Sequence, residues 1–390
     1  MKRSQDRILT THTGSLPRPD DLLDLMREKE NGRPYDAEAL ARRVKDSVKD
    51  VVHRQSDCGV DVINDGEQSK SGFATYQAER LSGFEALPLP PEGTTPSRPW
   101  REVQEFPEYY ERYFKVAMFG AALAPPKTYV CRGPVTYTGQ AAMQADLDNF
   151  KAALEGQSYA EAFVSSANPA NLADQQNEYY KTQEELLTAL ADAMREEYRT
   201  IIDAGFLIQM DDPSAATLWL GDQLPPEERK RHAEARVELI NYALKGIPED
   251  KIRYHTCFSI NQGPHIYDLH LRDYIGYLLA VNAQAVSFEV MNPRHMHDYH
   301  AFEDIRLPDG KIIIPGMLSH GANWVEHPEF IAQLTVNYAN LVGRENVMIG
   351  NDCGFASQAG SREVDPRIVW EKFKALSEGA AIASKKLWNR

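Results

Sequence analysis

Short apolar runs alternate along the chain with longer amphipathic stretches. The short runs are rich in β-branched residues and end in Gly, Pro, Asp or Asn, which is typical of buried strands. They are the run leading into residues 10–19 and residues 60–65, 128–134, 206–213, 252–259, 285–290, 311–318 and 346–353. Helix-like segments lie between them, and several open with Pro or a capping residue. Examples are residues 37–55, 182–204, 226–244, 328–342 and 366–385.

Alternation of strand and helix, repeated eight times, predicts an α/β fold with a parallel sheet. Eight is the number of strands that closes a TIM (β/α)8 barrel. An open doubly wound sheet is the competing fold, but no Gly-rich dinucleotide loop follows the first strand. We expect one domain over residues 1–390, because no linker separates two cores.

Two stretches interrupt this rhythm. Residues 85–127 combine a Pro-rich run with an aromatic-rich one and are too long for a simple loop. We interpret them as a hairpin or lid inserted after the second βα unit. Residues 155–175 are interpreted as a smaller insertion before a long helix.

The composition narrows the class of protein. The formal net charge of −14 gives a surface that repels phosphate backbones, so we expect no nucleic acid partner. The chain has no apolar run long enough to span a membrane and no secretory signal, so we expect a cytosolic protein. Four cysteines in 390 residues do not form a disulfide framework, which leaves core packing, metal binding or reactivity.

Metal-binding side chains stand at the ends of three predicted strands. His255 and Cys257 are two residues apart, so on a strand they point to the same face. Glu289 and Cys353 end two later strands, and barrel closure brings strand ends towards one axis. Two thiolates, an imidazole and a carboxylate suit Zn²⁺. The alternative is that the cysteines pack as small hydrophobic residues and the histidine is structural.

Other polar residues also fall at strand ends. Glu67, Asp211 and Asp212 have no nearby cation in the sequence, and such carboxylates can bind an ammonium group or orient a histidine ligand. Asp212 precedes Pro213, so it is equally suited to cap a helix. The Gly14-Ser15 turn offers N–H groups to a carboxylate, or is an ordinary strand-to-helix turn.

The remaining cysteines and histidines divide by position. Cys58 and Cys131 are interpreted as core residues. His12 and His320 lie at or near strand ends and are interpreted as pocket residues. The histidines of the polar segments after strands five to seven are interpreted as solvated or structural; they are His265, His295, His297, His300 and His327.

An ordered set of motifs spans nearly the whole chain. The motifs are TTHTGSLPRP, NDGEQ, RGPVT, IQMDDP, HTC, SFE and NDCGF. In this order the chain resembles the cobalamin-independent methionine synthase superfamily, and specifically its catalytic C-terminal half. The resemblance implies a catalytic zinc site formed by a strand-end HxC, a downstream Glu and a late DCG cysteine. These positions are His255, Cys257, Glu289 and Cys353.

The resemblance also implies roles in an amino acid pocket. Ser15 would hold the carboxylate of the substrate, and Glu67 and Asp211 would hold its ammonium group. These residues favour homocysteine as the methyl acceptor, which would give methionine. The chain lacks the duplicated N-terminal barrel of full-length methionine synthases, and its GPVTYTGQ segment has no tryptophan for folate. The alkyl donor is therefore left open.

The chain is also similar to epoxyalkane:coenzyme M transferases, in which a thiolate opens an epoxide. Coenzyme M carries a sulfonate and no amine, so its site would need a cation. Lys70, Arg18 and Arg132 are the candidates. Epoxide opening also needs an acid for the alkoxide, for which His12 and His320 are the candidates.

Two further classes are rivals. One is a non-catalytic barrel with a purely structural zinc ion, although such sites are usually closed by ligands at short local spacing. The other is a decarboxylase of the uroporphyrinogen type, which would leave HTC and NDCG without a role. The sequence thus predicts a zinc-dependent alkyltransferase whose partners are a small thiol and an alkyl donor, and it leaves a homo-oligomer open.

Overall fold

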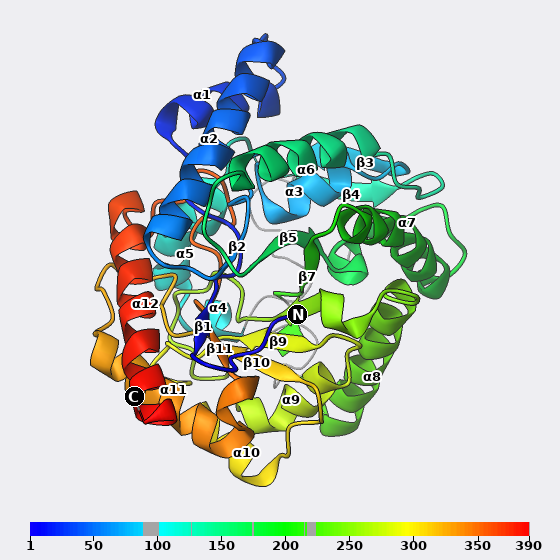
Figure 1. The fold of residues 1–390 in the computed structure, drawn as a ribbon. Helices are drawn as coiled ribbons and strands as arrows, with labels where there is room; N and C mark the ends of the chain where they lie inside the picture. Colours follow the sequence, from blue (N-terminus) through cyan, green and yellow to red (C-terminus); the bar gives the residue numbers. More distant parts are fainter. Residues whose placement is uncertain (89–100, 126, 174, 214, 217–223, 390) are drawn as a thin grey trace.

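A computed structural model describes residues 1–88, 101–125, 127–173, 175–213, 215–216 and 224–389 of the protein. Its central feature is a curled parallel sheet surrounded by helices (Figure 1). The strands of this sheet are β1 (Leu9–Thr10), β2 (Val62–Ile63), β5 (Glu161–Ala167), β7 (Leu207–Asp211), β8 (Ile252–His255), β9 (Ala285–Phe288), β10 (Ile312–Pro315) and β11 (Met348–Ile349).

Strand pairing runs in a circuit around the sheet. Six strands pair in the order β10-β9-β8-β7-β5-β2, and β1 pairs with β11, always in parallel. Isolated parallel bridges join Thr11 to Val62 and Gly316 to Gly350, which connects the β1–β11 pair to both edges of the larger sheet. The carboxyl ends of all eight strands therefore point to the same side of the molecule.

Helices cover the outside of the sheet. They are α1 (Asp20–Glu30), α2 (Ala37–Asp57), α3 (Phe73–Glu79), α6 (Gln140–Leu154), α7 (Gln183–Asp203), α8 (Pro226–Ala243), α9 (Leu271–Leu279), α10 (Ala301–Asp304), α11 (Pro328–Val342) and α12 (Pro366–Trp388). Their first turns follow the sequence signals. Asp36 and Thr182 accept hydrogen bonds from backbone N–H groups at the starts of α2 and α7, and Pro begins α8, α11 and α12.

The core has two parts. The larger part lies between the sheet and the helices, where the helices bury their apolar faces. The smaller part is a separate cluster to which most strands contribute one residue, as expected for side chains that fill the inside of a curled sheet. Its members are Leu9, Val62, Phe163, Leu207, Ala285, Ile312, Ile314 and Met348. The strands are thus buried on both faces, which explains their nearly continuous apolar sequences.

The expected third strand is corrected by the structure. Residues 128–134 were predicted to be a strand of the parallel sheet, but β4 (Lys127–Cys131) lies outside it. β4 pairs antiparallel with β3 (Phe84–Pro88) and parallel with β6 (Gln176–Asn177). The third strand of the circuit is instead β5, inside the stretch interpreted as a small insertion. Ser165 and Ser166 make β5 read as polar, yet both are buried and hydrogen-bonded.

Part of the segment 85–127 lies outside the described residues, namely 89–100 and 126. The described part holds two helices, α4 (Arg101–Glu105) and α5 (Pro107–Val116), between the antiparallel strands β3 and β4. Its function as a hairpin or lid stays a prediction. In the described part of the chain, no helix has the length and apolar character needed to cross a membrane.

Candidate functional site

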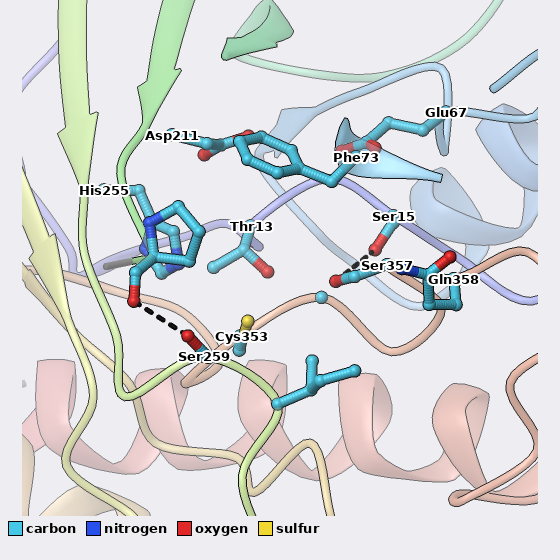
Figure 2. Close-up of a pocket in the computed structure, with 13 residues that line it drawn as sticks. Thr13, Ser15, Glu67, Phe73, Asp211, His255, Ser259, Cys353, Ser357 and Gln358 are labelled. Carbon is cyan, nitrogen blue, oxygen red and sulfur yellow. Dashed lines mark hydrogen bonds between the residues drawn. The ribbon is translucent and has the colours of Figure 1, made fainter. Parts of the chain in front are cut away.

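A cavity of about 160 Å³ opens where the strands of the parallel sheet end. Five residues that were singled out from the sequence border it: Ser15, Glu67, Asp211, His255 and Cys353. Figure 2 shows Glu67 and Asp211 along one edge of the cavity and Cys353 on the opposite side. The volume is below the roughly 300 Å³ at which pockets for drug-sized ligands begin, so the cavity suits a smaller molecule.

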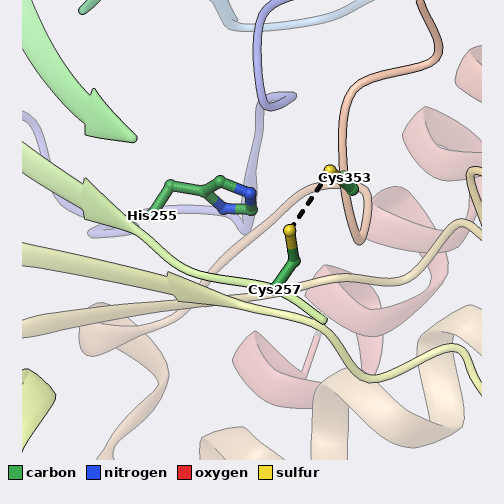
Figure 3. Close-up of side chains that lie close together, drawn as sticks. All are labelled: His255, Cys257 and Cys353. Carbon is green, nitrogen blue, oxygen red and sulfur yellow. Dashed lines mark hydrogen bonds between the residues drawn. The ribbon is translucent and has the colours of Figure 1, made fainter. Parts of the chain in front are cut away.

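The predicted metal ligands form a buried cluster beside this cavity. Atoms of His255, Cys257 and Cys353 that can bind a metal all lie within 4.8 Å of one another. The Sγ atoms of Cys257 and Cys353 are 3.2 Å apart, and both cysteines are free (Figure 3). His255 is the last residue of β8, while the two cysteines belong to the loops that follow β8 and β11.

The imidazole of His255 fits the role of a metal ligand. Its Nδ1 lies 3.1 Å from the Oγ of Ser287, whereas its Nε2 is buried and has no partner among the described residues. Burial, followed by the positive charge of Arg253, lowers the pKa of His255 to about 3, so the ring is neutral. A neutral imidazole whose second nitrogen is held by a hydroxyl is the usual form of a histidine ligand.

Glu289 lies next to the cluster of three rather than within it. Its carboxylate is buried and accepts a hydrogen bond of 3.2 Å from the backbone N–H of Phe258. Its charge reaches the cluster, because the pKa of Cys257 is raised by the contact with Cys353, by burial and by Glu289. Potential ligand atoms of Glu289 also lie within 4.8 Å of those of His320 and Asp352. The cluster itself thus consists of two thiols and an imidazole, donors that Zn²⁺ accepts, and Glu289 lies just outside it.

The opposite edge of the cavity is acidic. Burial and the charge of Glu67 raise the pKa of Asp211 well above its ordinary value, and Asp211 also accepts a hydrogen bond of 2.8 Å from Gln209. Glu67 has a φ of 54°, which is unusual for a residue other than glycine. A Cβ at Gly14, where φ is 127°, would lie 2.5 Å from the Oε1 of Glu67. Glycine at position 14 thus lets the first loop approach the Glu67 carboxylate.

No lysine or arginine occurs among the described residues that border the cavity. The three cations considered for a sulfonate are occupied elsewhere. Lys70 donates to the carbonyl of Ser165 at 2.6 Å, and the guanidinium of Arg18 donates to backbone carbonyls. Arg132 pairs on the outside with two carboxylates, those of Glu85 and Glu178. The described lining of the cavity thus carries two carboxylates and no lysine or arginine side chain.

A comparison with protein families agrees with this arrangement. The family described as "Cobalamin-independent synthase, Catalytic domain" matches residues 8–91 and 171–368, together more than two thirds of the chain. The chain belongs to this family. The matched parts of the cobalamin-independent synthase domain include every residue of the metal cluster and of the acidic edge. Residues 92–170, which hold α4, α5, β4, α6 and β5, lie outside the match.

Individual relatives of the domain are distant but extend over its full length. A methionine synthase of Sulfurisphaera tokodaii is 25% identical over 386 residues, covering 98% of this chain and 94% of the relative. A solved B12-independent methionine synthase of Shewanella sp. W3-18-1, in complex with selenomethionine, superposes with a TM-score of 0.73 at 19% identity, covering 98% and 100% of the two chains. A putative vitamin-B12 independent methionine synthase of Listeria monocytogenes superposes with a TM-score of 0.67 at 20% identity. The match covers 96% of this chain and 98% of the other.

The two histidines predicted as acids differ in their surroundings. His12 is buried between Phe163 and Phe373, and both of its ring nitrogens have partners, Gln55 and the N–H of Gly14. Burial lowers the pKa of His12 to about 3. Both nitrogens of His12 thus have partners within the fold, so its role as an acid stays a prediction that these contacts do not favour.

His320 is buried as well, but neither of its ring nitrogens has a hydrogen-bond partner within the described residues. Burial lowers the pKa of His320, so its ring is also neutral. It lies beside Glu289 and Asp352, and its role as an acid stays a prediction.

Asp212 proves to be structural. Its carboxylate pairs with the guanidinium of Arg236 on α8 and accepts a hydrogen bond of 2.8 Å from the hydroxyl of Tyr254. All three side chains are buried. Asp212 thus fixes α8 against β8, which is neither of the roles considered from its place before Pro213.

Several residues that border the cavity were not found from the sequence. They are Thr13, Phe73, Pro213, Ser259, Ile260, Gly354, Ser357 and Gln358. Most lie in loops beyond the ends of strands, where residue type carries no signal of its own. The closeness of Ser357 and Gln358 to Cys353 in sequence was the one indication available for these two.

A second buried polar cluster consists of two histidines and two aspartates. Asp268 is 2.5 Å from Nδ1 of His265 and 2.9 Å from Nε2 of His295, and Asp298 is 2.8 Å from Nδ1 of His295. Burial acts to lower the pKa of both imidazoles, but the hydrogen bonds and charges of the aspartates outweigh it. They raise the pKa of His265 and of His295 to about 9. Both histidines are therefore cations paired with carboxylates.

We expect this cluster to make the protein less stable at alkaline pH. Each raised pKa stabilises the folded state fully below the unfolded value of about 6.5, and this stability is lost as the pH rises through about 9. Each imidazole contributes at most roughly 3 kcal/mol. Melting temperatures between about pH 7 and about pH 10 should fall more steeply for wild type than for His265→Gln/His295→Gln. The matched control is His300→Gln, an exposed histidine; equal slopes for all three proteins would contradict the prediction.

Proposed function

We propose that this protein is a zinc-dependent methyltransferase that methylates the sulfur of homocysteine and forms methionine. One observation carries the proposal: a single small cavity has a thiol and imidazole cluster at one side and a carboxylate pair at the other. Homocysteine has a thiol at one end and an ammonium group at the other, so it matches both. The family and the distant relatives named methionine synthases support the same activity.

The roles of the site residues follow from this match. His255, Cys257 and Cys353, with Glu289 as the fourth ligand, would hold zinc. The metal would lower the pKa of a coordinated thiol, so that homocysteine is a thiolate near neutral pH. Glu67 and Asp211 would bind the ammonium group, which relieves the repulsion between the two carboxylates. The turn at Ser15 would bind the substrate carboxylate, which shares its carbon with the ammonium group, since Gly14 of this turn approaches Glu67.

In the reaction the thiol proton leaves, a sulfur–carbon bond forms, and the bond from the methyl group to its donor breaks. The donor departs with the bonding electron pair. We assign His320, and not His12, as the residue that exchanges a proton with the reacting groups, because its nitrogens have no other described partner. Phe73, Pro213 and Ile260 form the apolar part of the cavity through which the methyl group would approach.

The alternative thiol, coenzyme M, is less compatible with the site. A sulfonate would face Glu67 and Asp211, and like charges within a buried site repel each other. Lys70, Arg18 and Arg132 have other partners and do not border the cavity. Epoxide opening with coenzyme M is therefore the second candidate.

A thiol consumption assay tests the proposal. Zinc-loaded protein is incubated with homocysteine or coenzyme M, each with methyl-folate, methylcobalamin or a small epoxide as donor. We expect homocysteine to be consumed with a methyl donor, with methionine as the product by mass spectrometry, and coenzyme M to be left unchanged. Consumption of coenzyme M alone would favour the epoxide reaction, and loss of neither thiol would contradict alkyl transfer.

A further inference from the structure

The loop between β8 and α9, residues 256–270, forms part of both halves of the site. It begins beside Cys257, and its residues Ser259 and Ile260 border the cavity. It contains no helix or strand. Ser259 and His265 have φ angles of 60° and 56°, left-handed values that residues other than glycine rarely adopt. Such conformations persist only where the surroundings hold them.

Helices α4 and α5 supply much of that hold. The hydroxyl of Tyr109 donates to the carbonyl of Gln262 at 2.5 Å, and the hydroxyl of Tyr113 donates to the carbonyl of Ile260. Ile260 borders the cavity, so the hydrogen bond from Tyr113 holds the backbone of a cavity residue. The bonded residues are 153 positions apart in the first of these bonds and 147 positions apart in the second.

A buried carboxylate completes the contact. Glu102 accepts a hydrogen bond of 2.7 Å from the backbone N–H of Ile266 and lies 2.7 Å from the hydroxyl of Tyr110. The hydroxyl of Tyr110 is also 3.1 Å from the side-chain oxygen of Asn261. The fit is close, because a Cβ at Gly263 would lie 1.9 Å from the Tyr110 hydroxyl. The loop and the helices are thus complementary over residues 260–266.

The aromatic side chains of α4 and α5 do not belong to the main core. Tyr110, Tyr113 and Ala117 form a cluster of their own, with Val103, Tyr109 and Phe114 packed against it. This segment also lies outside the residues matched by the family, whereas the loop lies inside them. The hydrogen bonds of Glu102, Tyr109 and Tyr113 thus tie this segment to the loop.

We propose that Tyr109, Tyr110 and Tyr113 are positioning residues that fix the β8–α9 loop at the wall of the thiol pocket. The three residues together are called the tyrosine clamp. The clamp holds Ile260 and Ser259 in place and thereby sets the width of the cavity next to the metal-binding cysteines. Its importance for catalysis rests on the proposed function, whereas its effect on the loop does not.

Hydrogen exchange tests the effect on the loop. In Tyr109→Phe/Tyr113→Phe, which removes two hydroxyls and keeps the rings, amide exchange in residues 258–267 should become about tenfold faster or more. Gly263→Ala disturbs the same contact from the loop side and should also make amide exchange in residues 258–267 faster. Tyr242→Phe is the matched control, because it also removes a hydrogen-bonded hydroxyl, here one that donates to the carboxylate of Asp192 at 2.8 Å on the outer surface. Unchanged loop exchange in both clamp variants would overturn the proposal.

Steady-state kinetics tests the effect on the site. The double variant should retain its metal and its melting temperature, while KM for homocysteine rises about tenfold and kcat changes little. Faster loop exchange with an unchanged KM would overturn the role of the clamp in thiol binding. If wild-type protein consumes no homocysteine with any donor, the proposed function fails, and the exchange experiment still decides whether the clamp holds the loop.

Discussion

Replacing Cys353 with serine is expected to remove zinc from the protein and to slow methylation of homocysteine by about 1,000-fold or more, equivalent to about 4 kcal/mol of activation free energy. A serine hydroxyl is a poor ligand for a metal that prefers thiolate and imidazole. Cys353 also borders the cavity directly, so its loss affects the metal and the substrate together. Metal content by mass spectrometry and kcat/KM for homocysteine measure the two effects.

Cys131→Ser is the matched control, because Cys131 is equally buried and free but lies on β4, away from the cavity. It should keep both metal and activity. Full zinc content with normal activity in Cys353→Ser would contradict the proposed site. Zinc K-edge spectroscopy on wild type separates catalysis from a structural ion: a sulfur ligand gained on adding homocysteine supports catalysis, and an unchanged spectrum supports the structural role.

The second large effect is expected from Glu67→Gln. This change keeps the shape of the side chain and removes one of the two carboxyl groups proposed to bind the substrate ammonium group. Charge-assisted hydrogen bonds in a buried site contribute up to about 3 kcal/mol, so kcat/KM for homocysteine should fall by about 100-fold. Steady-state assays with 4-mercaptobutanoate, which is homocysteine without its amine, should show little difference between wild type and variant.

Comparing the two thiols isolates the contact between Glu67 and the amine. Only homocysteine carries an ammonium group that the Glu67 carboxylate would bind. Glu79→Gln is the control for a general loss of acidic charge, since Glu79 is exposed on α3 and pairs with Lys29 at 3.4 Å. Equal losses with both thiols would place Glu67 in support of the fold rather than at the amine. An unchanged rate with homocysteine would remove Glu67 from the site.

The parallel sheet was predictable from its apolar strands, with one exception. Seven of the eight expected segments contain strands of the circuit, and all the residues of these strands are buried. β5 was missed because Ser165 and Ser166 give it a polar sequence. The hydroxyl of Ser166 is satisfied at 2.7 Å by Glu197, a buried carboxylate on α7 that sequence position cannot reveal. The β-branched residues of β4 made it the more convincing strand.

The metal cluster and the acidic pair were predictable because they stand at strand ends, which converge in this fold. The roles of the other candidate residues depend on the groups that they contact, which the sequence does not show. Lys70 and His12 have the right type and place in the sequence, yet a carbonyl binds the first and Gln55 and Gly14 occupy the second. The sequence gives no indication of the tyrosine clamp. An aromatic helix does not show what it packs against or which groups its hydroxyls will bond.

Pairing of the first and last strands has a consequence for folding. Leu9 of β1 aligns with Met348 of β11, and the cavity joins Thr13 from one end of the chain to Cys353 from the other. Contacts so distant in sequence require a long loop to close, which makes them late events. On the ribosome the ligand set is incomplete until almost the whole polypeptide has emerged. Uptake of the proposed metal would therefore be tied to completed synthesis, because a chain truncated before Cys353 would lack one of the proposed ligands.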